Sequence, residues 1–396
     1  MIPEVDVAAL LADPHGQFRA LRAQHPVVQI MPGLYLVLRH ADVLAAASDP
    51  ALHQMQGADY VALAGIPRGP VAEFLTRIMV FDATAGHLVK RRPFNTALSF
   101  PKVDTMRAKI QGIAKAHVDD LPVGTPFDLV SALSARLPTA VICGILGFET
   151  DGPERAWILA RVEILSKSLA PIYPMEEHGE IEAAVVDLTA HVSKALAARQ
   201  SARRDDLLTA LLSTRGDLRL DDLVMQIVGM LMAGSDTTRS ALAVAASYLL
   251  ADWGTYDADP EPAIWEALRL DAPVGTLPLW TDADWPVPGG GGVVPGGSMV
   301  GLSTLSAMRD PAVFPDPDTF KADRAPPRDL VFGKGAHRCM GSRIAMIEIE
   351  ETLRALHRRF ARFDIPAPAR MQGFGGIRRA DPFVITGYEG PPDAAC

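Results

Sequence analysis

The chain has little cysteine: only Cys143, Cys339 and Cys396 occur in 396 residues. They are too few and too scattered for a disulfide framework, and none forms the C-x-x-C pair that is typical of zinc sites. This scarcity favours a reducing compartment, so we expect a cytoplasmic protein. Cys143, within AVICGILG, is expected in the core, and no function is assigned to Cys396. Any cysteine that acts in this chain acts singly.

Positive charge is also in short supply, with 38 Lys and Arg against 47 Asp and Glu and a net charge of -9. This balance argues against a global electrostatic interaction with nucleic acid or with anionic lipid. The first residues, MIPEVDVAALLAD, lack a basic start, an apolar run of signal length and a small-residue cleavage pattern. We therefore expect neither a secretion signal nor a membrane anchor.

Proline is absent between Pro174 and Pro260, whereas ten prolines fall within residues 271–330. The first stretch is predicted to be helical, and the second to be short extended pieces and turns. Amphipathic helices are predicted at residues 179–199 and 203–214.

Residues 222–250 are apolar nearly all round, which predicts a helix through the middle of a large protein. Gln226 and the run Asp236 to Arg239 interrupt the apolar pattern and argue against a membrane span. Helix is predicted to return at Gly341.

The segment FGKGAHRCMGSR, residues 332–343, places Cys339 between a glycine-rich approach and a helix start. A thiolate that binds iron needs N–H donors and a helix N-terminus close to the sulfur. Gly333 and Gly335 would let the backbone lie close to a flat ligand, and Phe332 can pack beside the sulfur. For an isolated cysteine, a small buried hydrophobe at a helix start is the alternative.

This segment resembles the haem-binding signature of the cytochrome P450 family, through Phe332, Gly333, Gly335, Arg338, Cys339 and Gly341. Four further segments match the family in its order along the chain. His87 to Arg91 resembles the segment that meets the haem propionates, and Ala233 to Thr238 resembles the oxygen-activating segment. Glu266 to Arg269 resembles the Glu-x-x-Arg pair, and DPAVFPDPDTF from Asp310 resembles the segment before the cysteine.

The resemblance implies a cytochrome P450 fold, mainly α with small β-sheets, in a single domain over residues 1–396. It also implies a haem b cofactor (iron protoporphyrin IX) with the Cys339 thiolate as the axial metal ligand. The cofactor-binding residues implied in this way are His87, Arg91, Ala233, Gly234, Phe332, Gly333, His337, Cys339 and Gly341.

Two pairs of residues have implied roles. Glu266 and Arg269 share a helix face and would form a structural pair that holds the cysteine segment, with an ordinary surface salt bridge as the alternative. Asp236 and Thr237 would form an acid–alcohol pair that delivers protons. The alternative for this segment is that Thr237 and Thr238 bond back to their own helix and Asp236 pairs with Arg239.

The chain departs from the family pattern at several points. Leu279 stands where many bacterial members carry a propionate-binding arginine. Thr319 stands where an arginine often completes the Glu266–Arg269 network, and Arg324 is nearby but off that position. ADWGTYDADPEP, from Ala251, suggests a loop where a helix is common.

The implied function is that of a monooxygenase that inserts one atom of O2 into an apolar organic substrate. Electrons would come from a separate ferredoxin-type donor and its reductase, because no flavin or iron–sulfur module follows. A monomer is expected. The alternatives are a peroxide-driven hydroxylase, which Asp236 and Thr237 argue against, and a non-enzymatic haem-thiolate binding or sensing protein.

Two surfaces are predicted around the implied cofactor. A basic face would steer the acidic electron carrier, with ordinary solvated charges as the alternative; it comprises Lys90, Arg91, Arg92, Lys334, Arg338 and Arg343. The substrate pocket is expected to draw on residues 61–81 and 164–172 and on Met230, Ala233, Val274, Leu277 and Leu279.

Overall fold

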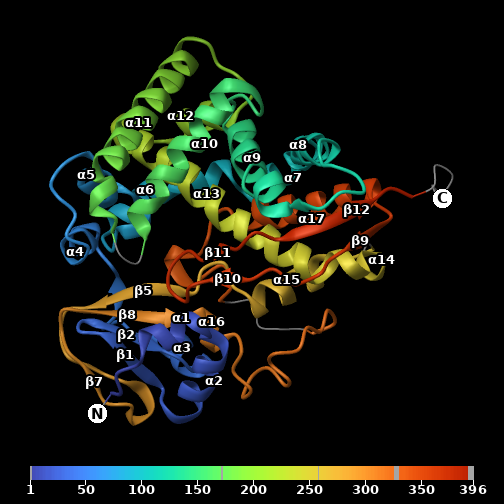
Figure 1. The fold of residues 1–396 in the computed structure, drawn as a ribbon. Helices are drawn as coiled ribbons and strands as arrows, with labels where there is room; N and C mark the ends of the chain where they lie inside the picture. The colour runs from blue at the N-terminus through green and yellow to red at the C-terminus, as the bar shows by residue number, and fades with distance from the viewer. Residues whose placement is uncertain (1, 171–172, 257, 325–329, 391–396) are drawn as a thin grey trace.

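The computed structural model describes residues 2–170, 173–256, 258–324 and 330–390. Most of the described chain is helical, and the sheets are small, as predicted. Figure 1 shows most of the helices gathered in one part of the molecule and, beside them, a sheet built from the N-terminal strands and from β5 and β8, against which α3 and α16 pack. Cys396 lies outside the described residues.

The helices follow one another along the chain as α1 Val7–Ala12, α2 Pro14–Gln24, α3 His40–Ala46, α4 Gly57–Leu63, α5 Pro70–Arg77, α6 Gly86–Ala97, α7 Phe100–Thr105, α8 Arg107–Asp119, α9 Leu137–Leu146, α10 Gly152–Ser166, α11 His178–Ser201, α12 Leu207–Thr214, α13 Leu220–Leu249, α14 Trp253–Tyr256, α15 Glu261–Leu270, α16 Thr304–Ala307 and α17 Ser342–Arg359. Short turns of other helix types include η5 Leu250–Asp252 and η7 Gly335–His337.

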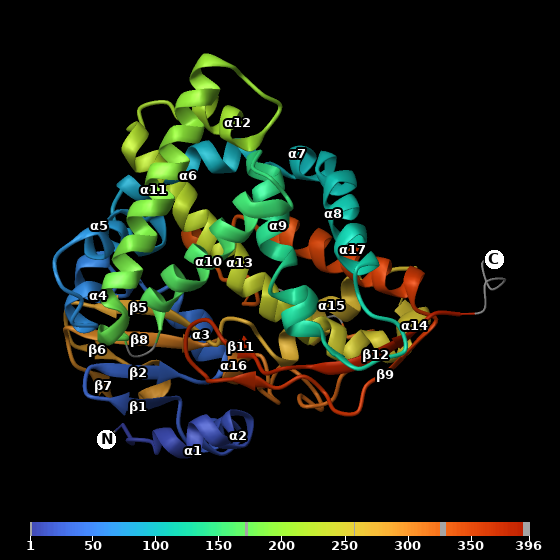
Figure 2. The same cartoon turned by 45° about the horizontal axis from the view of Figure 1, so that its top comes forward.

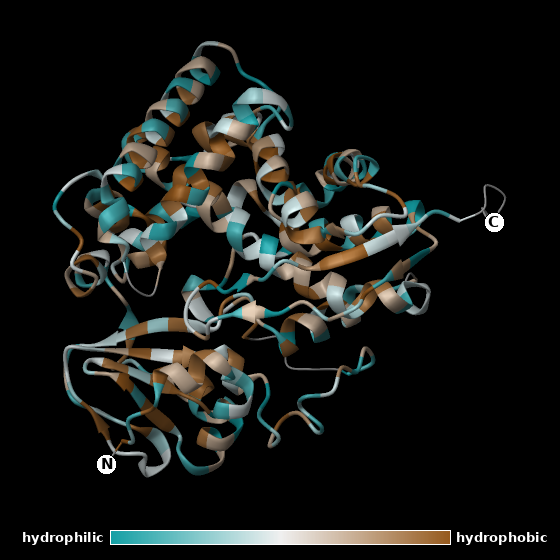
Figure 3. Cartoon of the chain, viewed as in Figure 1, coloured by the Kyte–Doolittle hydropathy of each residue, from teal (hydrophilic) through white to brown (hydrophobic). Residues whose placement is uncertain are grey.

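Helix α13 is the axis of the helical part and crosses its middle in two views (Figures 1 and 2). It packs against α9, α10, α11, α15 and α17, and its length agrees with the apolar stretch predicted at residues 222–250. Outer helices such as α11 alternate hydrophilic and hydrophobic residues along their length (Figure 3), as expected where only one face meets the core. Cys143 is buried in α9, as predicted. Among the described helices, none has the length and apolarity to cross a membrane.

Within the described residues, the strands form four small sheets. The largest has the order β1-β2-β8-β5-β3, in which β2 and β8 are parallel and the other neighbours antiparallel. The strands are β1 Val27–Met31, β2 Leu34–Val37, β3 His53–Gln54, β4 Phe127–Asp128, β5 Thr276–Thr281, β6 Trp285–Pro286, β7 Val293–Val294, β8 Ser298–Ser303, β9 Arg362–Asp364, β10 Met371–Gln372, β11 Arg379–Ala380 and β12 Val384–Tyr388.

Local signals explain where several elements begin. The carboxylate of Asp206 accepts a hydrogen bond from the Thr209 amide and caps α12. The helix therefore begins at Leu207, four residues after the predicted start at 203. The loop suggested from Ala251 is wrong in part, because η5 and α14 occupy residues 250–256. The glycine-rich stretch 287–302 forms the turn and second strand of the short β6–β7 hairpin and then most of β8, as its turn residues predict.

Candidate functional site

The cysteine segment forms a tight loop that ends at the start of α17. The Cys339 amide donates to the carbonyl oxygen of Phe332 at 2.8 Å, which closes the loop on itself. Gly333 and Gly335 have φ angles of 71° and 72°, a left-handed conformation that side chains other than glycine rarely adopt. The hydrogen bond and the two glycines therefore fix the shape of the loop.

The Cys339 residue is exposed, which contradicts the alternative of a buried small hydrophobe. The protein atoms around the sulfur desolvate it, and this raises the pKa of the Cys339 thiol. The backbone N–H of Gly341 and the charges of Arg91 and Arg338 act in the opposite direction, as does the Ser342 N–H. Two N–H groups at a helix start thus point at the sulfur, which is the environment that a metal-bound thiolate requires.

Helix α6 brings His87 and Arg91 to the cysteine loop. The His87 ring stacks on the His337 ring with centroids 3.9 Å apart, and the Arg91 guanidinium donates to the carbonyl oxygen of Arg338. Burial, together with the charge of Arg91, lowers the pKa of His87. Burial and the neighbouring His87 and Arg91 lower the pKa of His337 to about 4.

One atom in this cluster is left unsatisfied. Nε2 of His87 is buried and has no hydrogen-bond partner within the described part of the chain. A buried polar atom of this kind costs free energy unless a ligand completes it. Two imidazoles and a guanidinium beside the thiol of an exposed cysteine suit a ligand that carries both a metal and carboxylates. The residues present therefore fit a haem with its propionates.

Small side chains in the middle of α13 leave space at the surface of this helix. Ala233 is exposed and Gly234 is partly so, although the neighbouring Met232 and Ser235 are buried. The hydroxyl of Thr237 donates to the carbonyl oxygen of Ala233 at 2.7 Å, so the back-bonding alternative holds for this residue. Such a bond leaves the hydroxyl oxygen free to accept a second one.

The expected alternative for Asp236 is wrong. Its side chain is 5% exposed and pairs with Arg379 of β11, with Oδ2 and Nη2 3.1 Å apart. Arg239 pairs instead with Glu163 of α10, at 3.3 Å. Sequence analysis missed Arg379, because the two partners are 143 residues apart.

Glu266 and Arg269 form a fully buried pair in α15, so the surface salt-bridge alternative is wrong. Two hydrogen bonds of 2.7 and 2.9 Å join their side chains, each 0% exposed. Arg269 also donates to the carbonyl oxygens of Met308 and Pro317, which fixes the chain that leads to the cysteine loop.

Arg324 completes this network in place of a side chain at Thr319. Its Nε donates to Glu266 at 3.0 Å, and its other nitrogens donate to the carbonyl oxygens of Pro315, Asp316 and Thr319. The backbone of Lys321 adds a bond to Glu266 at 3.1 Å. Arg324, which lies off the usual position in the sequence, therefore still pairs with the Glu266 carboxylate.

The predicted substrate wall is only partly buried, as a cavity lining would be. Met230 lies on α13, Leu277 and Leu279 lie on β5, and Val274 precedes that strand. Leu279 pairs with Val300 of β8 and with Gln54 of β3. Strand β5, TLPLWT, contains no Lys or Arg that could stand in for the propionate-binding arginine of other family members.

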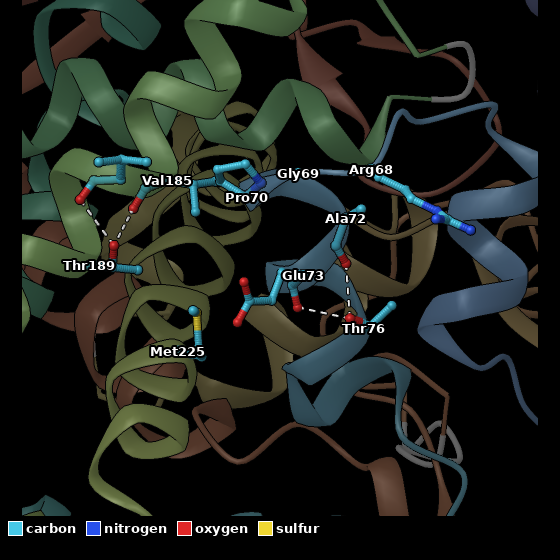
Figure 4. Close-up of a pocket in the computed structure, with 10 residues that line it drawn as sticks. Arg68, Gly69, Pro70, Ala72, Glu73, Thr76, Val185, Thr189 and Met225 are labelled. Carbon is cyan, nitrogen blue, oxygen red and sulfur yellow. Dashed lines mark hydrogen bonds between the residues drawn. The ribbon is translucent and has the colours of Figure 1, made fainter.

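A pocket of about 680 Å³ lies between α5, α11 and Met225 of α13 (Figure 4). The hydroxyls of Thr76 and Thr189 bond back to carbonyl oxygens of their own helices. The donor hydrogens of these two threonine hydroxyls are therefore used within their own helices. Six residues of the predicted wall line it, namely Arg68, Gly69, Pro70, Ala72, Glu73 and Thr76. Residues 164–170 and Met230, Ala233, Val274, Leu277 and Leu279 do not line it, and residues 171–172 lie outside the described residues.

Comparisons with known proteins agree with this arrangement. The model of the family "Cytochrome P450" matches residues 261–369. The plant-inducible cytochrome P450-pinF1 of Rhizobium radiobacter is 30% identical over 96% of this chain and 92% of its own. The steroid C26-monooxygenase of Mycobacterium tuberculosis is 29% identical over 97% and 98% of the two chains.

Solved structures show the same fold. The cytochrome P450 enzyme CxnD, for C-S bond formation in chuangxinmycin biosynthesis, has a TM-score of 0.84 at 26% identity and covers 99% of this chain and 98% of its own. CalO2 has a TM-score of 0.88 at 22% identity and covers 98% and 100% of the two chains. The fold, the site and a relative that matches nearly the whole chain lead to one conclusion: the chain belongs to the cytochrome P450 family and is a monooxygenase.

Proposed function

We propose that this protein, as a single domain in the cytoplasm, binds haem b through the Cys339 thiolate and oxidises an apolar organic substrate. The observation that carries the proposal is the Cys339 sulfur, which belongs to an exposed residue and faces the N–H groups of Gly341 and Ser342. When bound, the haem would supply the activation of O2. The reaction balances as RH + O2 + two electrons + two protons giving ROH + H2O.

His87, Arg91 and His337 would hold the haem propionates. An anion beside them would accept the hydrogen bond that Nε2 of His87 can donate. Its negative charge would also reduce the electrostatic repulsion between these closely spaced basic groups. This set replaces the arginine that is missing at Leu279. Ala233, Gly234, Phe332 and Gly333 would leave room for the ring.

Asp236 and Thr237 would move protons into the site. The Thr237 hydroxyl is fixed by its bond to Ala233 and keeps its oxygen lone pairs free to accept a proton donor. Asp236 would pass protons to this region from its buried position. An acid–alcohol pair favours O2 over peroxide as the oxidant.

The electron donor would be a separate acidic protein of the ferredoxin type. Of the six basic residues expected on its docking face, Lys90 pairs with Asp82 and Arg343 with Asp104, and Arg91 bonds to the cysteine loop. The exposed cations are Arg92, Lys334 and Arg338, near the exposed apolar Leu88 and Val89. Charge steers such encounters and apolar contact holds them.

The first test is the absorption spectrum of the reduced protein under carbon monoxide. A Soret band shifted far to the red is expected, because a thiolate ligand has this effect, and Cys339→Ser should abolish it. A band at the position of histidine-ligated haem, or no haem at all, would overturn the proposal.

A second test separates the oxidants. Turnover with a surrogate ferredoxin and reductase should exceed turnover with peroxide, and it should fall with added salt. Product formation from peroxide alone would favour the peroxide-driven alternative. Membership of a monooxygenase family removes the reason for the non-enzymatic alternative.

A further inference from the structure

The carboxylate that would feed protons into the site is held by a side chain outside α13. The side chain of Asp236 is 5% exposed, whereas that of its partner Arg379 is 45% exposed. The ion pair therefore joins a buried acid to a group that water can reach.

The β10–β11 hairpin that carries Arg379 is fixed to α13 independently of this pair. The Ser240 hydroxyl, one helical turn after Asp236, donates to the carbonyl oxygen of Arg378 at 2.6 Å. The Arg378 amide donates to Pro273 at 2.8 Å, and Ile377 forms a β-bridge with Val274. The backbone next to Arg379 is thus held on two sides.

The buried side chain of Arg378 anchors the same hairpin from within. Its guanidinium contacts the carboxylate of Asp271 at 3.3 Å and donates to the carbonyl oxygens of Gly373, Ala272 and Met371. Two neighbouring arginines consequently differ in role. Arg378 holds the scaffold together, and Arg379 is delivered to Asp236.

We propose that Arg379 is a positioning residue for proton delivery: it holds the Asp236 carboxylate at the β10–β11 hairpin, so that protons enter from the water beside the exposed guanidinium. This inference rests on the proposed function. A guanidinium does not release its own proton at working pH, so Arg379 acts by placing Asp236 and the protons come from water. The two protons of each turnover are consumed in the water that leaves.

The test compares holoenzymes carrying Arg379→Gln and Arg379→Lys with the unchanged protein and with Arg239→Gln. Arg239 is a matched control, since it also makes one ion pair beside Asp236 on α13, but with Glu163. For each protein, the product and the hydrogen peroxide formed per electron pair are measured in H2O and in D2O.

Arg379→Gln should lower the product per electron pair about threefold or more, raise hydrogen peroxide and enlarge the solvent isotope effect, because proton delivery becomes slower. Arg379→Lys should restore part of the yield, and Arg239→Gln should change neither the yield nor the isotope effect. Equal yields and isotope effects in Arg379→Gln and the unchanged enzyme would overturn the inference.

A measurement without turnover tests the pair itself. Arg379→Gln should lower the midpoint of thermal unfolding, and this shift should largely vanish in an Asp236→Asn background. Additive shifts would overturn the inference, whether or not the enzyme turns over. Absence of the red-shifted carbon monoxide band would instead defeat the proposed function and leave this cycle interpretable.

Discussion

Replacement of Arg324 by methionine tests whether this arginine completes the buried network around Glu266. The change keeps the apolar stem but removes the 3.0 Å bond to Glu266 and three bonds to backbone carbonyls. A hydrogen bond to a charged group contributes about 1.5–3 kcal/mol, and loss of one partner from a buried pair costs about 3–5 kcal/mol. Since Arg269 still neutralises Glu266, we expect a loss of about 2–3 kcal/mol.

The assay is urea unfolding of the haem-loaded protein, followed by circular dichroism. Arg19→Ala is the matched control, because it removes an arginine whose pair with Asp318 is exposed, with side chains 63% and 36% accessible. Exposed pairs contribute up to about 1 kcal/mol, so this variant should remain close to the unchanged protein. If Arg324→Met costs no more than Arg19→Ala, the network around Glu266 does not depend on Arg324.

Three further predictions concern the site and its support. Thr237→Ala should lower the product per electron roughly tenfold or more and release hydrogen peroxide, while the carbon monoxide band stays in place; unchanged yields would contradict a relay role. His87→Leu should speed haem transfer to an acceptor apoprotein about tenfold, and an unaltered rate would show that His87 makes no bond to the haem. Burial tends to raise the pKa of Asp271, but the bond from His15 and the charges of Arg378 and Arg309 lower it to about 2. Because the pKa of Asp271 in the folded protein lies below its unfolded value, the stability that the ionised carboxylate provides is present above about pH 4 and lost as the pH falls towards 2. Asp271→Asn should therefore lower the free energy of unfolding by about 2 kcal/mol at pH 7, as measured by urea unfolding. The difference in stability between the variant and the unchanged protein should shrink in acid.

The parts of the site that depend on neighbouring residues could be predicted from the sequence. The Cys339 loop needs glycines at fixed spacing and a helix start, and all of these lie within twelve residues. The Glu266–Arg269 pair is set by helical periodicity. Helix α13 was predictable because a helix that is apolar on all its faces is buried in the interior of a large protein.

The parts that depend on chain segments meeting in space were not predictable. Arg379 reaches Asp236 only because β11 is fixed against α13, and local sequence suggested Arg239 instead. Arg324 serves Glu266 although it is five residues after Thr319, because the intervening turn brings its guanidinium back to the carboxylate. Sequence spacing does not report such returns of the chain.

The Glu266 network also bears on the order in which the protein can be completed during synthesis. His87 and the open stretch of α13 leave the ribosome well before the cysteine loop. Glu266 must then wait for Arg324, 58 residues later, before its charge is balanced by both arginines. A nascent chain that has reached α15 thus carries an acid without its full set of partners, and the proposed haem would have no Cys339 sulfur to bind. Haem insertion should accordingly be a late event, and chains arrested before Cys339 should not retain the cofactor.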